Sequence, residues 1–173
     1  SSSACVMPVF VQLVQTFLLR FHASRLKPIA TEVVPSGGED GTFMAVDKKT
    51  SKPIWKCADD NPGYSTPYPF DFNGKRYIFC YAEKAGLIAN ASDGKLVCRI
   101  PWETAHNVNA SQPNYAGGLL FMATGYETGS AVYKLTPKGD GLGFEELWRN
   151  NVLLTKFTSC VLNDGVLYAG DQK

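Results

Sequence analysis

Along most of the chain, short runs of apolar residues alternate with short polar turns. Residues 43–46 form one such run, residues 47–51 are a polar cluster, and Ile54 and Trp55 follow as a second apolar segment. Asp and Ser favour turns because their side chains hydrogen-bond the nearby backbone. The pattern predicts a strand, a tight turn and a second strand that ends on a tryptophan.

This hairpin pattern is repeated twice further along the chain. The second copy spans residues 86–98. A looser third copy runs from residue 131, through an expected glycine-rich turn at residues 138–143, to Trp148. A single shift aligns the first two copies at three positions, Asp47 with Asn90, Ser51 with Gly94, and Trp55 with Cys98. A self-similar period of about 40–50 residues, built from short strands, is typical of β-propellers, whose small sheets bury their faces by stacking on one another.

The residues of the first copy carry a more specific resemblance. Ala45-x-Asp47-x-x-Thr50-Ser51-Lys52-x-x-Trp55 resembles the A-x-D-x-x-T-G-K-x-x-W signature of the pyrroloquinoline-quinone-type (PQQ-like) repeat propellers. The resemblance covers about residues 36–173. The chain departs from the signature at Ser51, where the family has glycine, and at Cys98, which stands at the tryptophan position of the second copy.

The resemblance implies an all-β fold, a partial β-propeller made of four-stranded antiparallel blades. In this family the tryptophan docks between adjacent blades, near the turn of a neighbouring repeat. The resemblance therefore implies a structural, blade-docking role for five residues of this chain, Trp55, Trp148, Asp47, Thr50 and Gly94.

The number of repeats limits how much of a propeller this chain contains. Its 173 residues hold two fairly complete repeats and partial ones at both ends, whereas a closed ring needs about four to eight blades of four strands. We therefore expect residues 31–173 to be an incomplete set of blades, from a longer propeller chain or a truncated product.

The first thirty residues stand outside the repeat pattern. The segment from Ala4 to Phe21 is largely apolar, with near-helical spacing that favours a helix. It lacks a preceding basic stretch and is marginal in length for a membrane span of about 20 apolar residues. Three interpretations stay open, namely a targeting segment, an amphipathic helix that packs on the sheets, and sequence foreign to the fold.

Charge and cysteine content narrow the possible partners and cofactors. The formal net charge is +1 and 19% of the residues are charged, which argues against nucleic acid or an anionic membrane as a partner. The five cysteines are widely spaced, without a C-x-x-C pair and odd in number. We therefore expect neither a zinc or redox site nor a fully paired disulfide framework.

No catalytic residue can be named from the sequence. His106 lies with Asn107 and Asn109 in a stretch, residues 101–109, that we expect to be an exposed loop between blades. It has no second histidine beside it, so we expect no metal site. The adjacent Asp59 and Asp60 are expected to cap a turn. The chain contains neither a G-x-S-x-G elbow nor a phosphate-binding loop.

The sequence favours a non-catalytic scaffold or protein-binding module, which holds a protein partner or small ligand through blade loops and needs no cofactor. The resemblance implies export, to the periplasm or beyond. The alternative is part of a calcium- and PQQ-dependent alcohol or sugar dehydrogenase. Enzymes of that kind carry adjacent cysteines near the quinone, which this sequence lacks, so the enzyme interpretation is disfavoured.

Overall fold

The computed structural model describes residues 31–37 and 41–170. Apart from a short 3-10 turn, η1 (Ala105–Asn107), its regular elements are all β-strands, and every pairing between them is antiparallel. The predicted all-β class with four-stranded antiparallel sheets is therefore confirmed. The expected helix or targeting segment in residues 1–30 lies outside the described residues.

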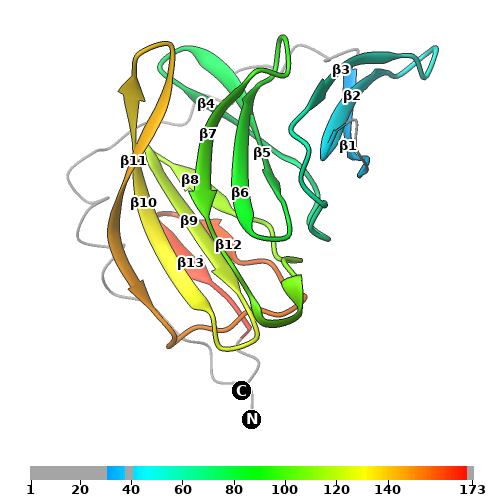
Figure 1. Cartoon of the computed structure of the whole chain (residues 1–173). Coiled ribbons are helices and arrows are strands. Elements are labelled where there is room, and N and C mark those ends of the chain that lie inside the picture. Colours follow the sequence, from blue (N-terminus) through cyan, green and yellow to red (C-terminus); the bar gives the residue numbers. More distant parts are fainter. Residues whose placement is uncertain (1–30, 38–40, 171–173) are drawn as a thin grey trace.

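The described strands form four sheets that follow one another along the chain (Figure 1). The first sheet contains β1 (Thr31–Pro35), β2 (Phe43–Asp47) and β3 (Pro53–Cys57). The second contains β4 (Tyr68–Phe72), β5 (Lys75–Tyr81), β6 (Ala85–Asn90) and β7 (Leu96–Pro101). The third contains β8 (Asn114–Ala116), β9 (Leu119–Thr124), β10 (Gly129–Lys138) and β11 (Gly141–Asn150), and the fourth contains β12 (Val161–Asn163) and β13 (Val166–Tyr168).

Within each sheet every strand pairs with the next one in sequence, so each sheet is a simple meander. The sequence also predicts correctly the hairpin turn between the first two strands of the second sheet. Asn73 and Gly74, which join β4 to β5, have φ values of 49° and 75°, as a two-residue hairpin of the primed type requires. Gly117–Gly118 and Asp164–Gly165 have positive φ at the equivalent turns of the third and fourth sheets.

The second sheet is buried on both faces, because its strands are apolar at successive positions rather than at alternate ones. On β5, Phe79 and Tyr81 pack toward the third sheet, whereas Ile78 and Cys80 pack toward the first. We call the core between the first and second sheets the first junction, that between the second and third the second junction, and that between the third and fourth the third junction.

The outer face of the fourth sheet is not covered in the same way. Leu167 is only 3% exposed and belongs to the third junction. Val161 and Tyr168, which pair across β12 and β13, are 62% and 48% exposed. Within the described residues, the stack therefore ends on a sheet face that carries exposed apolar side chains.

Two expectations from the sequence were wrong. The glycine-rich turn expected at residues 138–143 is mostly strand, because β10 continues to Lys138 and β11 begins at Gly141. The longer hairpin buries Leu135 and Leu142 against the second sheet. Residues 101–109 are also not a wholly exposed loop, since Trp102 and Asn109 have exposures of 1% and 0%.

Replacing Phe79 with alanine tests whether the second junction carries stability. The ring is fully buried and meets Tyr81 edge-on at 4.8 Å, so its removal leaves a cavity and should lower the free energy of unfolding by about 3–5 kcal/mol in urea titration. Ile54, 51% exposed, is the control, and its alanine variant should change stability by about 0.5 kcal/mol or less. Equal losses for the two variants would contradict this packing.

Candidate functional site

The same β-bulge occurs in the first three sheets, and it aligns them residue by residue. The last regular pair before each bulge is Ala45 with Trp55, Ile88 with Cys98, and Val132 with Trp148. After each of these pairs the outer strand holds one extra residue, which is Ile54, Val97 or Leu147. A bulge bends its strand and increases its twist locally, so the three outer strands approach the next sheet in equivalent ways.

Trp55 fills the space between the outer strand of the first sheet and a turn of the second. Its indole N–H donates a hydrogen bond to the carbonyl oxygen of Ala91, at 3.2 Å. Its ring lies so close to Gly94 that an added Cβ atom there would stand 2.6 Å from Cε3. Gly94 also has a left-handed φ of 72°, which glycine adopts without a steric penalty.

Asp47 and Thr50 organise the corresponding turn of the first sheet. One carboxylate oxygen of Asp47 accepts hydrogen bonds from the backbone N–H groups of Thr50 and Lys49, at 2.8 and 3.0 Å, and from the Thr50 hydroxyl at 2.9 Å. These bonds, above all that from the Thr50 backbone, hold the pKa of Asp47 below its usual value. Ser51 takes the left-handed conformation here, with φ 57°.

Trp148 occupies the tryptophan position of the third sheet. It is partly buried and packs on the third junction, with its ring 6.2 Å from that of Phe121. The five residues with an expected docking role are thus not one cluster. Trp55 and Gly94 meet at the first junction, Asp47 and Thr50 share a turn of the first sheet, and Trp148 lies on the third sheet.

A groove of about 690 Å³ lies at the second junction, where Cys98 stands in place of a tryptophan. One wall is formed by Lys95 to Arg99 on β7 and the turn before it, and the other by the tip of the β10–β11 hairpin. Burial raises the pKa of the Cys98 thiol to about 11. Lys95 pairs with Asp140 across the groove and lowers the pKa of that carboxyl.

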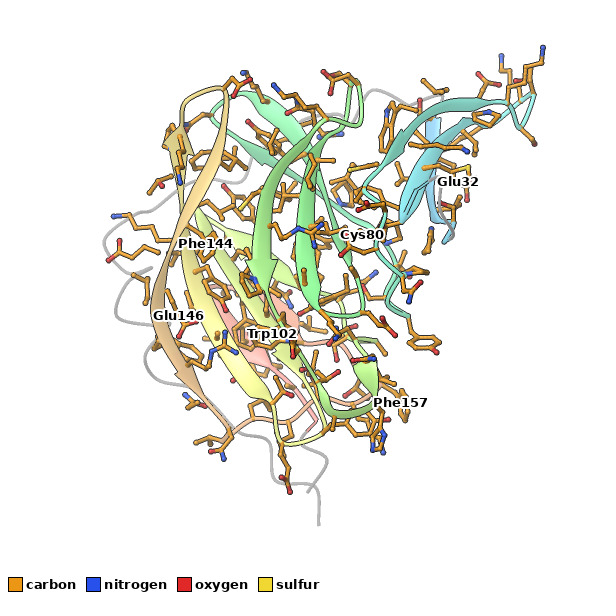
Figure 2. The ribbon with its side chains drawn as sticks, in the orientation of Figure 1. Glu32, Cys80, Trp102, Phe144, Glu146 and Phe157 are labelled. Atoms are coloured by element: carbon orange, nitrogen blue, oxygen red, sulfur yellow. The ribbon has the colours of Figure 1, made fainter. Side chains whose placement is uncertain are left out.

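A second candidate surface, here called the loop-end patch, consists of the contacting residues His106, Tyr126, Lys156 and Phe157, together with Tyr64, whose backbone is hydrogen-bonded to the connection that carries His106. The His106 and Tyr126 rings meet edge-on at 5.5 Å. The Lys156 ammonium lies 4.5 Å from the centre of the Tyr126 ring and 5.5 Å from that of Phe157. Tyr64 is 74% exposed and Phe157 is 65% exposed, and Phe157 projects at the edge of the molecule (Figure 2).

Three connections between sheets meet at this end. The connection between β7 and β8 contributes His106, that between β11 and β12 contributes Phe157, and that between β3 and β4 contributes Tyr64. The Tyr64 N–H donates to the carbonyl of Asn109, and the Ser111 hydroxyl donates to the carbonyl of Thr155 at 2.8 Å. The β7–β8 connection therefore links the other two.

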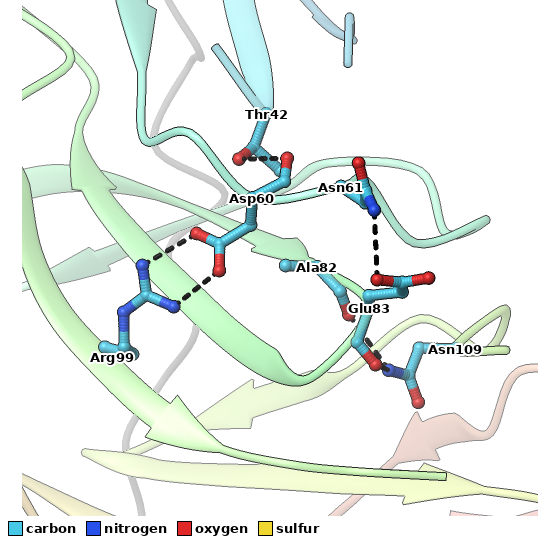
Figure 3. A network of polar contacts seen from close by, with 7 residues as sticks. All are labelled: Thr42, Asp60, Asn61, Ala82, Glu83, Arg99 and Asn109. Carbon is cyan, nitrogen blue, oxygen red and sulfur yellow. Dashed lines mark hydrogen bonds and ion pairs between the residues drawn. The ribbon is translucent and has the colours of Figure 1, made fainter. Parts of the chain in front are cut away.

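A polar network fixes these connections to the sheets (Figure 3). Arg99 on β7 pairs with both carboxylate oxygens of Asp60, each at 2.7 Å, so Asp60 holds two sheets together rather than capping a turn. The amide of Asn109 donates to the carbonyls of Ala82 and Glu83, at 2.9 and 3.1 Å. The Glu83 carboxylate accepts from Asn61 and Asn107, both at 3.1 Å.

Trp102 is the residue that sequence reasoning missed most clearly. It is buried between the second and third sheets, where its indole N–H donates to the Thr124 hydroxyl at 3.1 Å and the Arg149 guanidinium lies 4.5 Å above its ring (Figure 2). Its burial could have been predicted from the presence of a tryptophan in an otherwise polar loop, since such a large apolar side chain is usually buried in a core.

Other kinds of site find less support. In residues 31–37 and 41–170, no group of three or more His, Cys, Asp or Glu side chains is placed to hold a metal ion. In the same residues, no helix has the length and apolar character needed to cross a membrane. The described cysteines, Cys57, Cys80, Cys98 and Cys160, are buried free thiols.

Comparison of the chain with models of known protein families and with curated protein sequences gives no match.

Alanine at Gly94 should destabilise the protein far more than alanine at Gly74. Both glycines have similar left-handed φ values, 72° and 75°, but only Gly94 faces Trp55, and Gly74 has no neighbour within 4 Å of an added Cβ. Backbone strain of about 1–2 kcal/mol is common to both, and we expect about 1–3 kcal/mol more at Gly94 from overpacking. In a Trp55→Ala background, urea unfolding should show the two alanine substitutions to be equivalent; a persisting difference would refute the proposed contact.

Asn109→Ala should lower the free energy of unfolding by about 1–3 kcal/mol, because it leaves the buried carbonyl of Ala82 and the partly buried carbonyl of Glu83 without this donor. Asn107 also donates to Glu83, but its acceptor is the half-buried side-chain carboxylate rather than a main-chain carbonyl. Asn107→Ala should therefore have an effect of about 1 kcal/mol or less. Thermal and urea unfolding of both variants provide the measurement. An Asn109 variant as stable as wild type would show that the network does not hold the connections.

Proposed function

We propose that this chain is a non-catalytic scaffold that binds a protein partner, built as consecutive blades of a PQQ-like β-propeller. The family resemblance, with the same bulge in three successive sheets, supports the propeller interpretation. Export to the periplasm or beyond belongs to this proposal, as an implication of the resemblance.

The observation that carries the binding role is the loop-end patch. Exposed aromatic side chains are enriched where proteins bind one another, because they bury a large area with little loss of conformational freedom. Tyr64 and Phe157 remain largely exposed, although both belong to connections that are hydrogen-bonded to the β7–β8 connection. An exposed aromatic surface on a fixed framework suits recognition of a partner.

The framework beneath the patch is rigid for a physical reason. Ser111 is 1% exposed and its hydroxyl lies within hydrogen-bonding distance of Thr155 and Thr158 on the next connection. Asn109 is bonded to the second sheet. Buried polar contacts between the connections and the sheets, such as those of the Ser111 hydroxyl and the Asn109 amide N–H groups, favour one arrangement of the chain. Partner binding at the patch therefore requires little ordering of the loops, which favours affinity.

The test is to select peptides from a random library on the immobilised protein and to measure the affinity of the enriched peptides. We expect the double variant Tyr64→Ala, Phe157→Ala to bind them at least about tenfold more weakly than wild type. Val161→Ala, an exposed residue on the fourth sheet, is the control and should bind like wild type. Equal binding by wild type and the double variant would overturn the assignment of this surface.

The same protein should be titrated with PQQ in the presence of calcium. The proposal predicts no saturable change in quinone absorbance, whereas a saturable change that depends on calcium would favour the dehydrogenase alternative. This readout is independent of the peptide selection, so the two interpretations are separated by different signals.

A further inference from the structure

We infer that the groove at the second junction binds an extended acidic segment of a partner protein, and that a tryptophan of that segment inserts beside Cys98. This inference goes beyond the loop-end patch. The groove lies at the Thr136–Lys138 end of β10, whereas Tyr126 of the patch precedes the opposite end of the same strand, at Gly129.

The chain itself provides the template for the inserted side chain. Trp55 and Cys98 occupy the same position relative to the β-bulge of their sheets. Trp55 reaches the turn of the following sheet, at Ala91 and Gly94. Cys98 faces the β10–β11 hairpin of the third sheet, which is the equivalent element, and Cys98 and this hairpin line the groove. The space that an indole fills at the first junction is thus bounded by equivalent elements at the second.

The longer β10–β11 hairpin replaces only part of the missing tryptophan. Leu135 and Leu142 from this hairpin join Cys98 in the core of the second junction. Gly141 approaches the Val97 carbonyl so closely that an added Cβ atom would lie 2.8 Å from its oxygen. Even so, the groove of about 690 Å³ remains, and Phe144, which is 39% exposed, lines it. A planar aromatic ring can contact both Phe144 and the apolar floor.

The shape and charge of the groove favour a peptide over a small aromatic molecule. β7 is the last strand of its sheet, and one wall of the groove is formed by the consecutive residues Lys95 to Arg99. An end strand offers backbone donors and acceptors to an added strand. The lining carries Lys95, Arg99 and Lys138 against Asp140. Lys95 is paired with Asp140 and Arg99 with Asp60, so the exposed Lys138 is the cation that attracts an acidic segment to the rim of the groove.

The experiment uses a labelled peptide of about ten residues, with one central tryptophan flanked by glutamates, and measures its binding to the whole chain by fluorescence anisotropy. Matched peptides replace the tryptophan with alanine or the glutamates with lysines. We expect each replacement to weaken binding at least about tenfold, and we expect binding to weaken as salt is added.

Cys98→Trp is the decisive variant, because it supplies the indole from within the chain and closes the groove. We expect it to lose peptide binding by about tenfold or more, while Cys98→Ala, which leaves the groove open, retains it. Lys138→Glu changes only an exposed side chain of the rim and should also weaken binding. If the Cys98→Trp variant does not fold, the Lys138→Glu variant still tests the inference.

Three results would overturn the inference. They are no binding of the tryptophan peptide at about 1 mM, undiminished binding by Lys138→Glu together with a folded Cys98→Trp, and binding of N-acetyltryptophanamide as tight as that of the peptide. The last would indicate a small-molecule site. The variant Tyr64→Ala, Phe157→Ala should bind the peptide like wild type, so failure here and failure of the loop-end patch are distinguishable.

Discussion

Burial of both faces of each central sheet is the constraint on which this structure depends. The second sheet is apolar at successive positions, with Phe79 and Ile78 on opposite faces of β5, and such a sheet is stable only when another layer covers each side. The first and third sheets provide those layers. The connections between sheets must then pass from layer to layer. The Asn109 amide and the Ser111 hydroxyl fix them there by donating to the carbonyls of Ala82 and Thr155.

The tryptophan position shows how one residue adapts to its junction. At the first junction the turn is short, and Trp55 spans the distance to Gly94. At the second junction the facing hairpin is longer, so Leu135 and Leu142 reach across from the other side and a cysteine is sufficient. Both solutions cover the apolar surface of the junction, by different means. At the second junction a groove remains at the surface, with Lys138 on its rim.

Much of the fold was predictable because local chemistry determined it. Asn73–Gly74 allows only a tight hairpin at that point, and the spacing from Asp47 to Trp55 fixes a turn and a strand. The predictions that were wrong concern residues whose environment is set by parts of the chain distant in sequence. Nothing near Trp102 in sequence indicates that Thr124 and Arg149 surround it. Likewise, the strand character of Gly141 and Gly143 follows from packing on the second sheet, which overrides the turn preference of glycine.

The two-sided burial of β5 has a consequence for how the chain finds its alignment. In a sheet with one solvent-exposed face, a shift of the strand register by one residue would place polar side chains in the core and is therefore strongly disfavoured. In β5 such slippage exchanges Phe79 for Ile78 or Cys80, so one apolar residue replaces another. The hydrophobic pattern therefore discriminates weakly between alignments. The hairpin at Asn73–Gly74 and the Glu83 contacts just after β5 therefore help to select the native one, so these polar groups contribute to the fidelity of folding alongside the aromatic core.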